Sequence, residues 1–192
     1  DRGYLLRNEL EQLVTFNCDK KKDELVKDLF VFSCFTGLSY SDMKGLRNSN
    51  IQDFFDGNQW IIVRRKKTAT SSNVMLLDIP KMIIEKYAGL SKDGKVFPVP
   101  SNTVCNDSLK RISKQIECLK EKKVTFHLAR HTFATLFLSE GVPLESLSKM
   151  LGHKNIATTQ IYAKILNEKV GKDMQKVSHK FKGMEQSFVS QL

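Results

Sequence analysis

Three short β-rich runs lie near the middle of a chain whose other segments carry the apolar spacing of helices. The runs are separated by Asp56-Gly57-Asn58 and by the polar residues 68–73, and they cover Ile51–Phe55, Trp60–Arg64 and Val74–Ile79. Turn-forming residues between short β-rich runs predict antiparallel hairpins. The sequence therefore predicts a mainly α-helical fold with a small three-stranded antiparallel β-sheet.

Helical spacing lies on both sides of these strands. Before them we expect a short helix from Glu9 to Val14, a buried helix from about Asp23 to Thr36, and a third helix capped by Ser41. After them we expect helices over 82–87, 102–120, 128–139, 143–151 and 156–165, the second of these capped by Asn102 or Thr103. Pro143 is expected in the first turn of its helix.

The domain boundaries are predicted from the same pattern. Residues 1–8 are interpreted as a leader or linker, and residues 9–192 as one domain. The segment 167–192 is a charged tail in which Val170, Met174 and Val177 recur at helical spacing. We expect this tail either to pack on its own domain or to contact a neighbouring copy.

The charge balance points to a polyanionic partner. The chain carries 31 Lys and Arg against 21 Asp and Glu, a formal net charge of +10. Such an excess is typical of nucleic-acid binding, although a lysine-rich surface also serves solubility. The four cysteines form no CxxC pair, and no apolar run is long enough for a membrane span. These features favour a reduced, cytoplasmic protein without a membrane anchor.

Several residues of the last third have the types and spacing of a phosphate site. His127 and Arg130 share one helix face because they are three residues apart. His153 follows a predicted helix end at Leu151-Gly152, and Tyr162 comes nine residues later. Taken singly, each has an ordinary interpretation as surface polarity, a helix-end residue or a core aromatic.

Taken in order, these residues resemble the signature of the tyrosine recombinase (lambda integrase) family. The resemblance also includes the stretch Thr125–Thr135, the turn Gly141-Val142-Pro143, and Thr36-Gly37-Leu38 followed by Ser41-Asp42. It covers the chain from about Glu9 to Ile165 and extends to integrases of conjugative transposons and related mobile elements. It implies the catalytic fold of DNA breaking-rejoining enzymes.

The resemblance implies a role for each matched residue. Tyr162 is the nucleophile that forms a 3′-phosphotyrosine and frees a 5′-hydroxyl. Arg130 and His153 donate hydrogen bonds to the phosphate as negative charge develops on it. His127 accepts the tyrosine proton or holds the tyrosine in place. Lys67, on the predicted hairpin, protonates the leaving 5′-oxygen.

The basic hairpin and the residue after Arg130 are expected to contact DNA. These DNA-binding candidates are Arg64, Arg65, Lys66 and His131. Lys66 is also the alternative proton donor, because strand alternation points it and Lys67 in opposite directions. The resemblance implies no cofactor and no metal, and the sequence has neither a P-loop nor clustered carboxylates.

One position departs from the family pattern. Ser39 stands where the family usually carries its first arginine, directly after Thr36-Gly37-Leu38. Loss of one such donor costs about 10²–10³ in rate. Either another cation fills the gap, with Lys27, Lys44, Arg47 and Arg65 as candidates, or the protein is a weakened relative that only binds DNA. A type IB topoisomerase, which uses nearly the same chemistry, is a further alternative.

The resemblance also implies partners. The family adds an N-terminal DNA-binding domain, so the sequence is expected to represent the catalytic part of a longer integrase. That part alone is expected to be monomeric and to bind double-stranded DNA weakly. On its target we expect a tetramer of protomers, joined through C-terminal helices and assisted by DNA-bending proteins, at the nucleoid of the cytoplasm.

Overall fold

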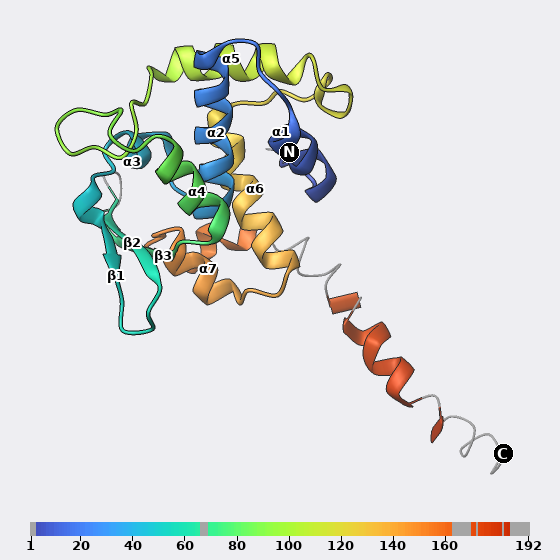
Figure 1. Ribbon diagram of the computed structural model, residues 1–192. Coiled ribbons are helices and arrows are strands. Elements are labelled where there is room, and N and C mark those ends of the chain that lie inside the picture. The colour runs from blue at the N-terminus through green and yellow to red at the C-terminus, as the bar shows by residue number, and fades with distance from the viewer. Residues whose placement is uncertain (1–2, 66–68, 163–169, 172, 182, 185–192) are drawn as a thin grey trace.

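The computed structural model describes residues 3–65, 69–162, 170–171, 173–181 and 183–184 (Figure 1). The helices before the sheet are α1 (Arg7–Thr15), α2 (Lys21–Thr36), α3 (Tyr40–Lys44) and the 3₁₀ turn η1 (Asn48–Asn50). The strands are β1 (Ile51–Asp53), β2 (Gln59–Arg64) and β3 (Ser71–Met75). The remaining elements are α4 (Asp78–Lys86), α5 (Asn102–Ser113), η2 (Glu117–Leu119), α6 (Phe126–Ser139), α7 (Leu144–Met150), η3 (Ile156–Thr158) and η4 (Gln160–Tyr162).

Helix α2 lies at the centre of the fold, against α1, α4, α5 and α6 (Figure 1). Buried residues lie in almost every turn of α2 and include Phe30 and Phe32. The helix therefore lacks the polar face that a surface helix shows. Phe32 meets Phe97 edge-on, and Phe30 meets Phe126. The sequence prediction of a largely buried helix that ends at Thr36-Gly37 is confirmed.

The sheet is antiparallel with strand order β1-β2-β3, as the sequence predicts. Its register pairs Ile61 with both Ile51 and Val74. The prediction of a third strand over Val74–Ile79 is wrong in its bounds. The strand covers Ser71–Met75, and helix α4 already begins at Asp78. Pro80 therefore belongs to the first turn of α4, where an amide has no helical partner to lose.

Several helix ends also differ from the sequence prediction. Ser39, not Ser41, caps α3 by accepting the Asp42 amide, and Ser101 caps α5 in place of Asn102 or Thr103. Helix α5 ends at Ser113, and the segment 156–162 forms two 3₁₀ turns instead of an α-helix. Pro143 is the N-cap of α7, one residue earlier than expected.

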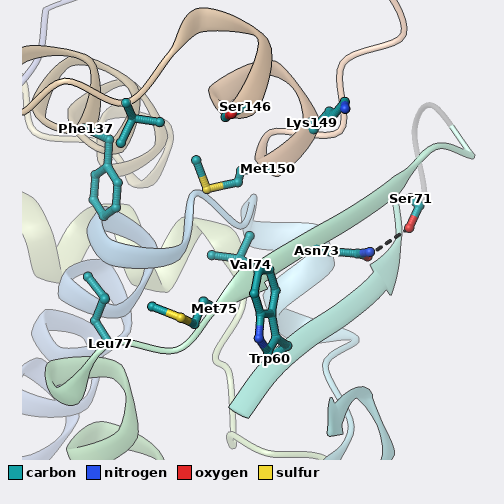
Figure 2. A pocket seen from close by; sticks show the side chains of 11 residues that line it. Trp60, Ser71, Asn73, Val74, Met75, Leu77, Phe137, Ser146, Lys149 and Met150 are labelled. Carbon is teal, nitrogen blue, oxygen red and sulfur yellow. Dashed lines mark hydrogen bonds between the residues drawn. The ribbon is translucent and has the colours of Figure 1, made fainter. Parts of the chain in front are cut away.

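An apolar groove of about 530 Å³ lies between β3, α7 and the end of α6 (Figure 2). Its lining includes Trp60, Met75, Leu77, Phe137 and Met150. At one side the sheet is tied to α7, because the Ser72 hydroxyl donates to the Met150 carbonyl. This hydrogen bond holds the sheet against the end of α7, directly before Leu151, Gly152 and His153.

The described part of the tail is helical and stands away from the body of the domain (Figure 1). Its apolar side chains are exposed, from 40% at Val177 to 67% at Met184, with Met174 at 62%. The helical spacing predicted for Val170, Met174 and Val177 is thus present, without burial on this chain's own surface. None of the described helices is long and apolar enough to cross a bilayer.

Candidate active site

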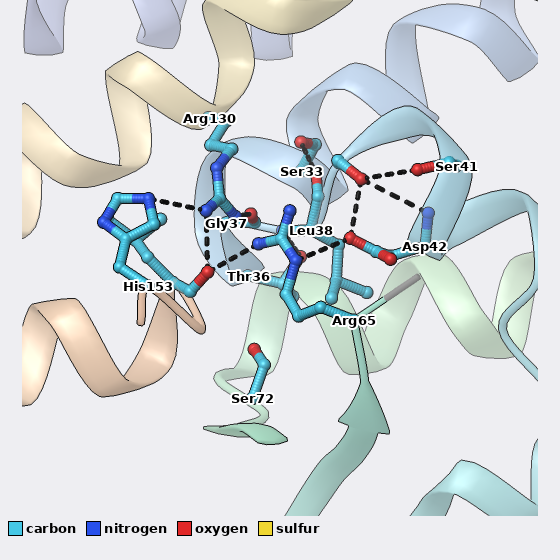
Figure 3. Close-up of polar contacts among 12 residues, drawn as sticks. Ser33, Thr36, Gly37, Leu38, Ser41, Asp42, Arg65, Ser72, Arg130 and His153 are labelled. Carbon is cyan, nitrogen blue, oxygen red and sulfur yellow. Dashed lines mark hydrogen bonds and ion pairs between the residues drawn. The ribbon is translucent and has the colours of Figure 1, made fainter. Parts of the chain in front are cut away.

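Arg130 points from α6 into the space between the ends of α2 and α7. Its Nη1 donates to the Gly37 carbonyl at 2.6 Å, and its Nη2 donates to the Leu151 carbonyl at 2.6 Å. The same Nη2 lies 3.0 Å from His153 Nε2. Two helix ends therefore hold the guanidinium through their carbonyl oxygens, and His153 lies beside it (Figure 3).

Gly37 allows this approach. It ends α2 in the left-handed conformation, at φ +67°, and a Cβ built on it would lie 2.6 Å from Phe133 Cδ1. Glycine enters this region of backbone space without the steric cost that a side chain adds. The tight turn brings the Gly37 carbonyl to Arg130 and directs the chain to Ser39.

Arg65, which follows β2, enters the same space from the opposite side. Its Nη1 donates to the Leu151 carbonyl at 2.6 Å, and its Nε forms an ion pair with Asp42 Oδ2 at 2.9 Å. The Arg65 residue is only 7% exposed. Figure 3 shows the guanidinium groups of Arg65 and Arg130 close together, and both donate to the Leu151 carbonyl. Arg65 and Arg130 thus share one acceptor.

The absence of a side chain at Gly152 makes room for Arg65. A Cβ at this position would lie 2.6 Å from Arg65 Cδ and 2.7 Å from Arg65 Cγ. Such distances are shorter than real Cβ contacts, so any other residue here would displace the arginine stem. The glycine of the Leu-Gly-His sequence is therefore part of the Arg65 binding pocket.

Ser39 is integrated into this arrangement through Asp42. Its hydroxyl donates to Asp42 Oδ2 at 2.6 Å, the same oxygen that pairs with Arg65. A serine hydroxyl is a single neutral donor. Arg65, which follows β2, thus shares Asp42 with the serine.

The other three candidate cations are held elsewhere. Lys27 donates to the Phe16 carbonyl at 2.8 Å, and Arg47 donates to the Asp93 carbonyl at 2.6 Å. Lys44 lies over the Tyr40 ring, 5.8 Å from its centroid. Of the four cations named from the sequence, all within the described residues, Arg65 is the one that reaches Arg130.

Burial and the repulsion between positive charges lower the pKa values of Arg130 and His153 in this cluster. Burial, followed by the charge of Arg65, lowers the pKa of Arg130 to about 9, so its guanidinium remains protonated at neutral pH. Burial and the charges of Arg130 and Arg65 lower the pKa of His153 to about 4. Two confined cations beside a neutral imidazole form a preorganised site for an anion.

Tyr162 lies close to this cluster, but its hydroxyl contacts a histidine other than the one expected. The hydroxyl lies 2.7 Å from His131 Nδ1, and both residues are buried. His127 is exposed, and it lines a cavity of about 390 Å³ that adjoins the cluster through Ser39 and Arg130. The sequence assigned the tyrosine contact to His127 and a DNA contact to His131; the structure places the tyrosine contact on His131.

The hairpin between β2 and β3 carries the other predicted residues. Lys67 and Lys66 lie outside the described residues. Arg64 is exposed, and its Nε donates to the Ala69 carbonyl at 2.9 Å. The described ends of the loop are tied together, since the Arg65 amide donates to the Thr70 carbonyl at 2.9 Å.

Comparison with known families agrees with this arrangement. The sequence model of the phage integrase family matches residues 4–169. The chain belongs to the phage integrase family. This match covers helices α1 to α7, the sheet and every residue of the cluster, and it confirms the family resemblance drawn from the sequence.

Individual relatives are tyrosine recombinases. The chain is 33% identical over 156 residues to the tyrosine recombinase XerA of Saccharolobus solfataricus. The aligned region covers 81% of this chain and 50% of that protein. The chain is 30% identical over 184 residues to XerA of Thermococcus onnurineus, covering 90% of this chain and 61% of that protein. The chain thus spans about half to three fifths of the length of these relatives.

Solved structures share the fold of this phage integrase domain. A crystal structure of XerA recombinase superimposes with a TM-score of 0.69 at 22% identity, covering 89% of this chain and 65% of that one. XerH bound to a palindromic difH substrate gives 0.72 at 19% identity, covering 90% and 52%. The Tn1549 transposon integrase with circular intermediate DNA gives 0.67 at 20% identity, covering 84% and 62%. The predicted fold class is confirmed.

The depressed pKa of His153 predicts a stability that depends on pH. The unfolded state takes up a proton near the usual histidine value of about 6.5, whereas the folded ring resists it down to about 4. The unfolding free energy should therefore be fully present above about pH 6.5 and fall as the pH drops toward 4. We expect this group to contribute about 1–2 kcal/mol, because partial solvent exposure of the ring weakens the effect.

Urea denaturation across this pH range checks the prediction. His153→Gln keeps a polar side chain but does not titrate, so its unfolding free energy should decline less steeply than that of the wild type. Parallel curves for the two proteins would show that His153 does not have a depressed pKa.

Proposed function

We propose that this chain is the catalytic part of a site-specific DNA recombinase that cuts and rejoins strands through a 3′-phosphotyrosine. The observation that carries the proposal is the convergence of Arg130, Arg65 and His153 around the Leu151 carbonyl, with Tyr162 on an adjoining turn. A phosphodiester undergoing attack gains negative charge on its oxygens, and fixed cationic donors stabilise that charge.

In this mechanism the two arginines bind the scissile phosphate. Each guanidinium has five N–H donors in a planar fork, more than the carbonyl contacts of the resting site use. His153 donates a further hydrogen bond once the phosphate offsets the repulsion from Arg130 and Arg65. Tyr162 supplies the nucleophilic oxygen, and Lys67 remains our proposed donor of the proton to the 5′-oxygen.

Double-stranded DNA is the proposed substrate, and the protein acts on it at the nucleoid. The net charge of +10 and the exposed Arg64 beside the hairpin suit contacts with the phosphate backbone. Lys66 on the same hairpin belongs to the proposed contact surface. Structural neighbours carry DNA in the same fold, including XerH with difH and the Tn1549 integrase with transposon right end DNA.

The proposed chemistry predicts a covalent adduct that depends on Tyr162. A nicked suicide substrate carrying the junction of the element should trap the wild-type protein on the 3′ phosphate, because the nicked strand cannot rejoin. Tyr162→Phe should give no adduct, since it keeps the ring and removes the attacking oxygen. Adducts are counted on denaturing gels.

The alternatives give different outcomes. Adducts on arbitrary duplexes together with relaxation of supercoiled plasmid would indicate a topoisomerase instead. DNA binding without any adduct on the correct junction would indicate a relative that only binds.

The proposed role of Arg65 predicts a compensation between two positions. Arg65→Gln should slow adduct formation at saturating DNA by about 10²–10³, the usual cost of losing one such donor. Ser39→Arg alone should bring little gain, because the cation is already present. The double variant Ser39→Arg with Arg65→Gln should recover part of the rate, because Asp42 can pair with an arginine from either position.

Arg47→Ala serves as the matched control, because it removes a cation held by Asp93 outside the cluster. Melting temperatures and DNA affinities for all variants separate a loss of chemistry from a loss of fold. A large gain from Ser39→Arg alone would mean that Arg65 does not fill the missing position.

We further propose that the tail joins protomers in a DNA-bound tetramer. Val170, Met174, Val177, Phe181 and Met184 form an exposed apolar stripe with spacings of three and four residues, which is the spacing of one helix face. The groove between β3 and α7 offers a complementary apolar surface, with Met150 among its lining residues (Figure 2). An apolar helix face and an apolar groove on the same chain suit exchange between copies.

This proposal predicts a loss of assembly without a loss of cleavage on one site. Met174→Lys should reduce formation of complexes with several protomers on paired sites, and Gln175→Lys should not, although it adds the same charge on another face. Sedimentation of the protein with DNA measures assembly, and the suicide substrate measures cleavage. Equal assembly by both variants would remove the tail from the interface.

A further inference from the structure

The hydrogen bond between Tyr162 and His131 closes a network around the nucleophile. His131 Nδ1 lies 2.7 Å from the tyrosine hydroxyl, and the two rings lie 5.8 Å apart between centroids. Tyr162 is 7% exposed and packs with Phe133, Leu147 and Leu151. The hydroxyl therefore contacts an imidazole nitrogen in a setting with little access for water.

The short turns η3 and η4 tie this hydrogen bond to the cationic cluster. Thr159 lies between them, and its Oγ1 is 2.8 Å from His153 Nδ1. Its carbonyl accepts the Tyr162 amide at 3.1 Å. His153 Nε2 in turn lies 3.0 Å from Arg130 Nη2. Arg130 is the residue directly before His131 on α6. One histidine thus holds each end of the segment that carries the nucleophile.

We propose that His131 accepts the phenolic proton of Tyr162 when the tyrosine attacks DNA, an inference that rests on the proposed recombinase function. As the bond between Tyr162 Oη and phosphorus forms, the bond between phosphorus and the 5′-oxygen breaks. The phenolic proton passes along the existing hydrogen bond to His131 Nδ1. The departing 5′-oxygen takes its proton from a separate acid, the hairpin lysine or water.

His127 acts on this pair through His131. The two imidazole rings meet edge-on, with centroids 4.5 Å apart and planes at 87°. His127 itself lies at the exposed end of the pair and lines the cavity beside Ser39. Among the described residues, Arg130 couples electrostatically with Tyr162, and Arg65 and Asp42 act on the same arginine. His153 lies beside Arg130. His127 is thus a positioning residue for the proton acceptor.

The test measures single-turnover adduct formation as a function of pH. A substrate with sulfur in place of the bridging 5′-oxygen needs no acid for its leaving group, so it isolates removal of the tyrosine proton. His131→Asn keeps an acceptor near the Nδ1 position but cannot take up a proton. At neutral pH this variant should react about 10²–10⁴ times more slowly than the wild type. His127→Asn removes the positioning imidazole and leaves His131 in place, so it should slow the reaction to a similar extent at every pH.

The shapes of the pH profiles decide the proposal. The wild-type rate should level off at alkaline pH, whereas the His131→Asn rate should rise about tenfold per pH unit, because only solvent then removes the proton. His127→Asn should keep the wild-type shape. A His131→Asn profile parallel to the wild type, or a linear rise in His127→Asn instead, would overturn the proposal while leaving the Tyr162 adduct intact.

A second measurement uses the wild-type fold. The ¹⁵N resonance of His131 Nδ1 should show an unprotonated, hydrogen-bonded nitrogen, and Tyr162→Phe should shift it. An unchanged resonance would overturn the proposal even if His131→Asn failed to fold. Absence of any adduct from the wild type, with this resonance as expected, would contradict the recombinase function and not the hydrogen bond.

Discussion

The organisation of the site depends on one backbone carbonyl, that of Leu151, which accepts hydrogen bonds from Arg130 and Arg65. Two cations repel each other, and the partial negative charge of a carbonyl oxygen between them offsets part of that repulsion. At the end of α7, Arg130 from α6 and Arg65 from the end of β2 therefore bind the same carbonyl oxygen. Asp42 balances one cation from α3, and Gly37 supplies a second carbonyl to the other.

This arrangement explains why three separate segments must pack well before any chemistry is possible. The turn at Gly37 and the gap at Gly152 each admit a neighbour that a Cβ would exclude. The Ser72 hydroxyl binds the Met150 carbonyl and so holds the sheet, from whose β2 strand Arg65 follows, against the end of α7. A site built in this way tolerates little movement of its frame, which suits preorganised stabilisation of charge.

The sequence alone predicts the fold class, the buried α2 and the order of the sheet, because these follow from local periodicity. The family resemblance also brings Arg130 and His153 to one site, and the structure places Arg130 Nη2 3.0 Å from His153 Nε2. The sequence does not distinguish His131 from His127, since both lie on nearly the same face of α6 and tertiary packing selects between them. Nor does it choose Arg65 among four cations, because its contact with Leu151 joins residues far apart in the chain.

The position of the second arginine directly after β2, and not at residue 39, has a mechanical consequence. A guanidinium at position 39 would belong to the rigid helical frame before any ligand arrives. Arg65 instead precedes the basic hairpin loop, whose described ends are closed by the Arg65 and Thr70 backbone. Any displacement of these loop ends would therefore also pull the Arg65 guanidinium away from the Leu151 carbonyl and Asp42.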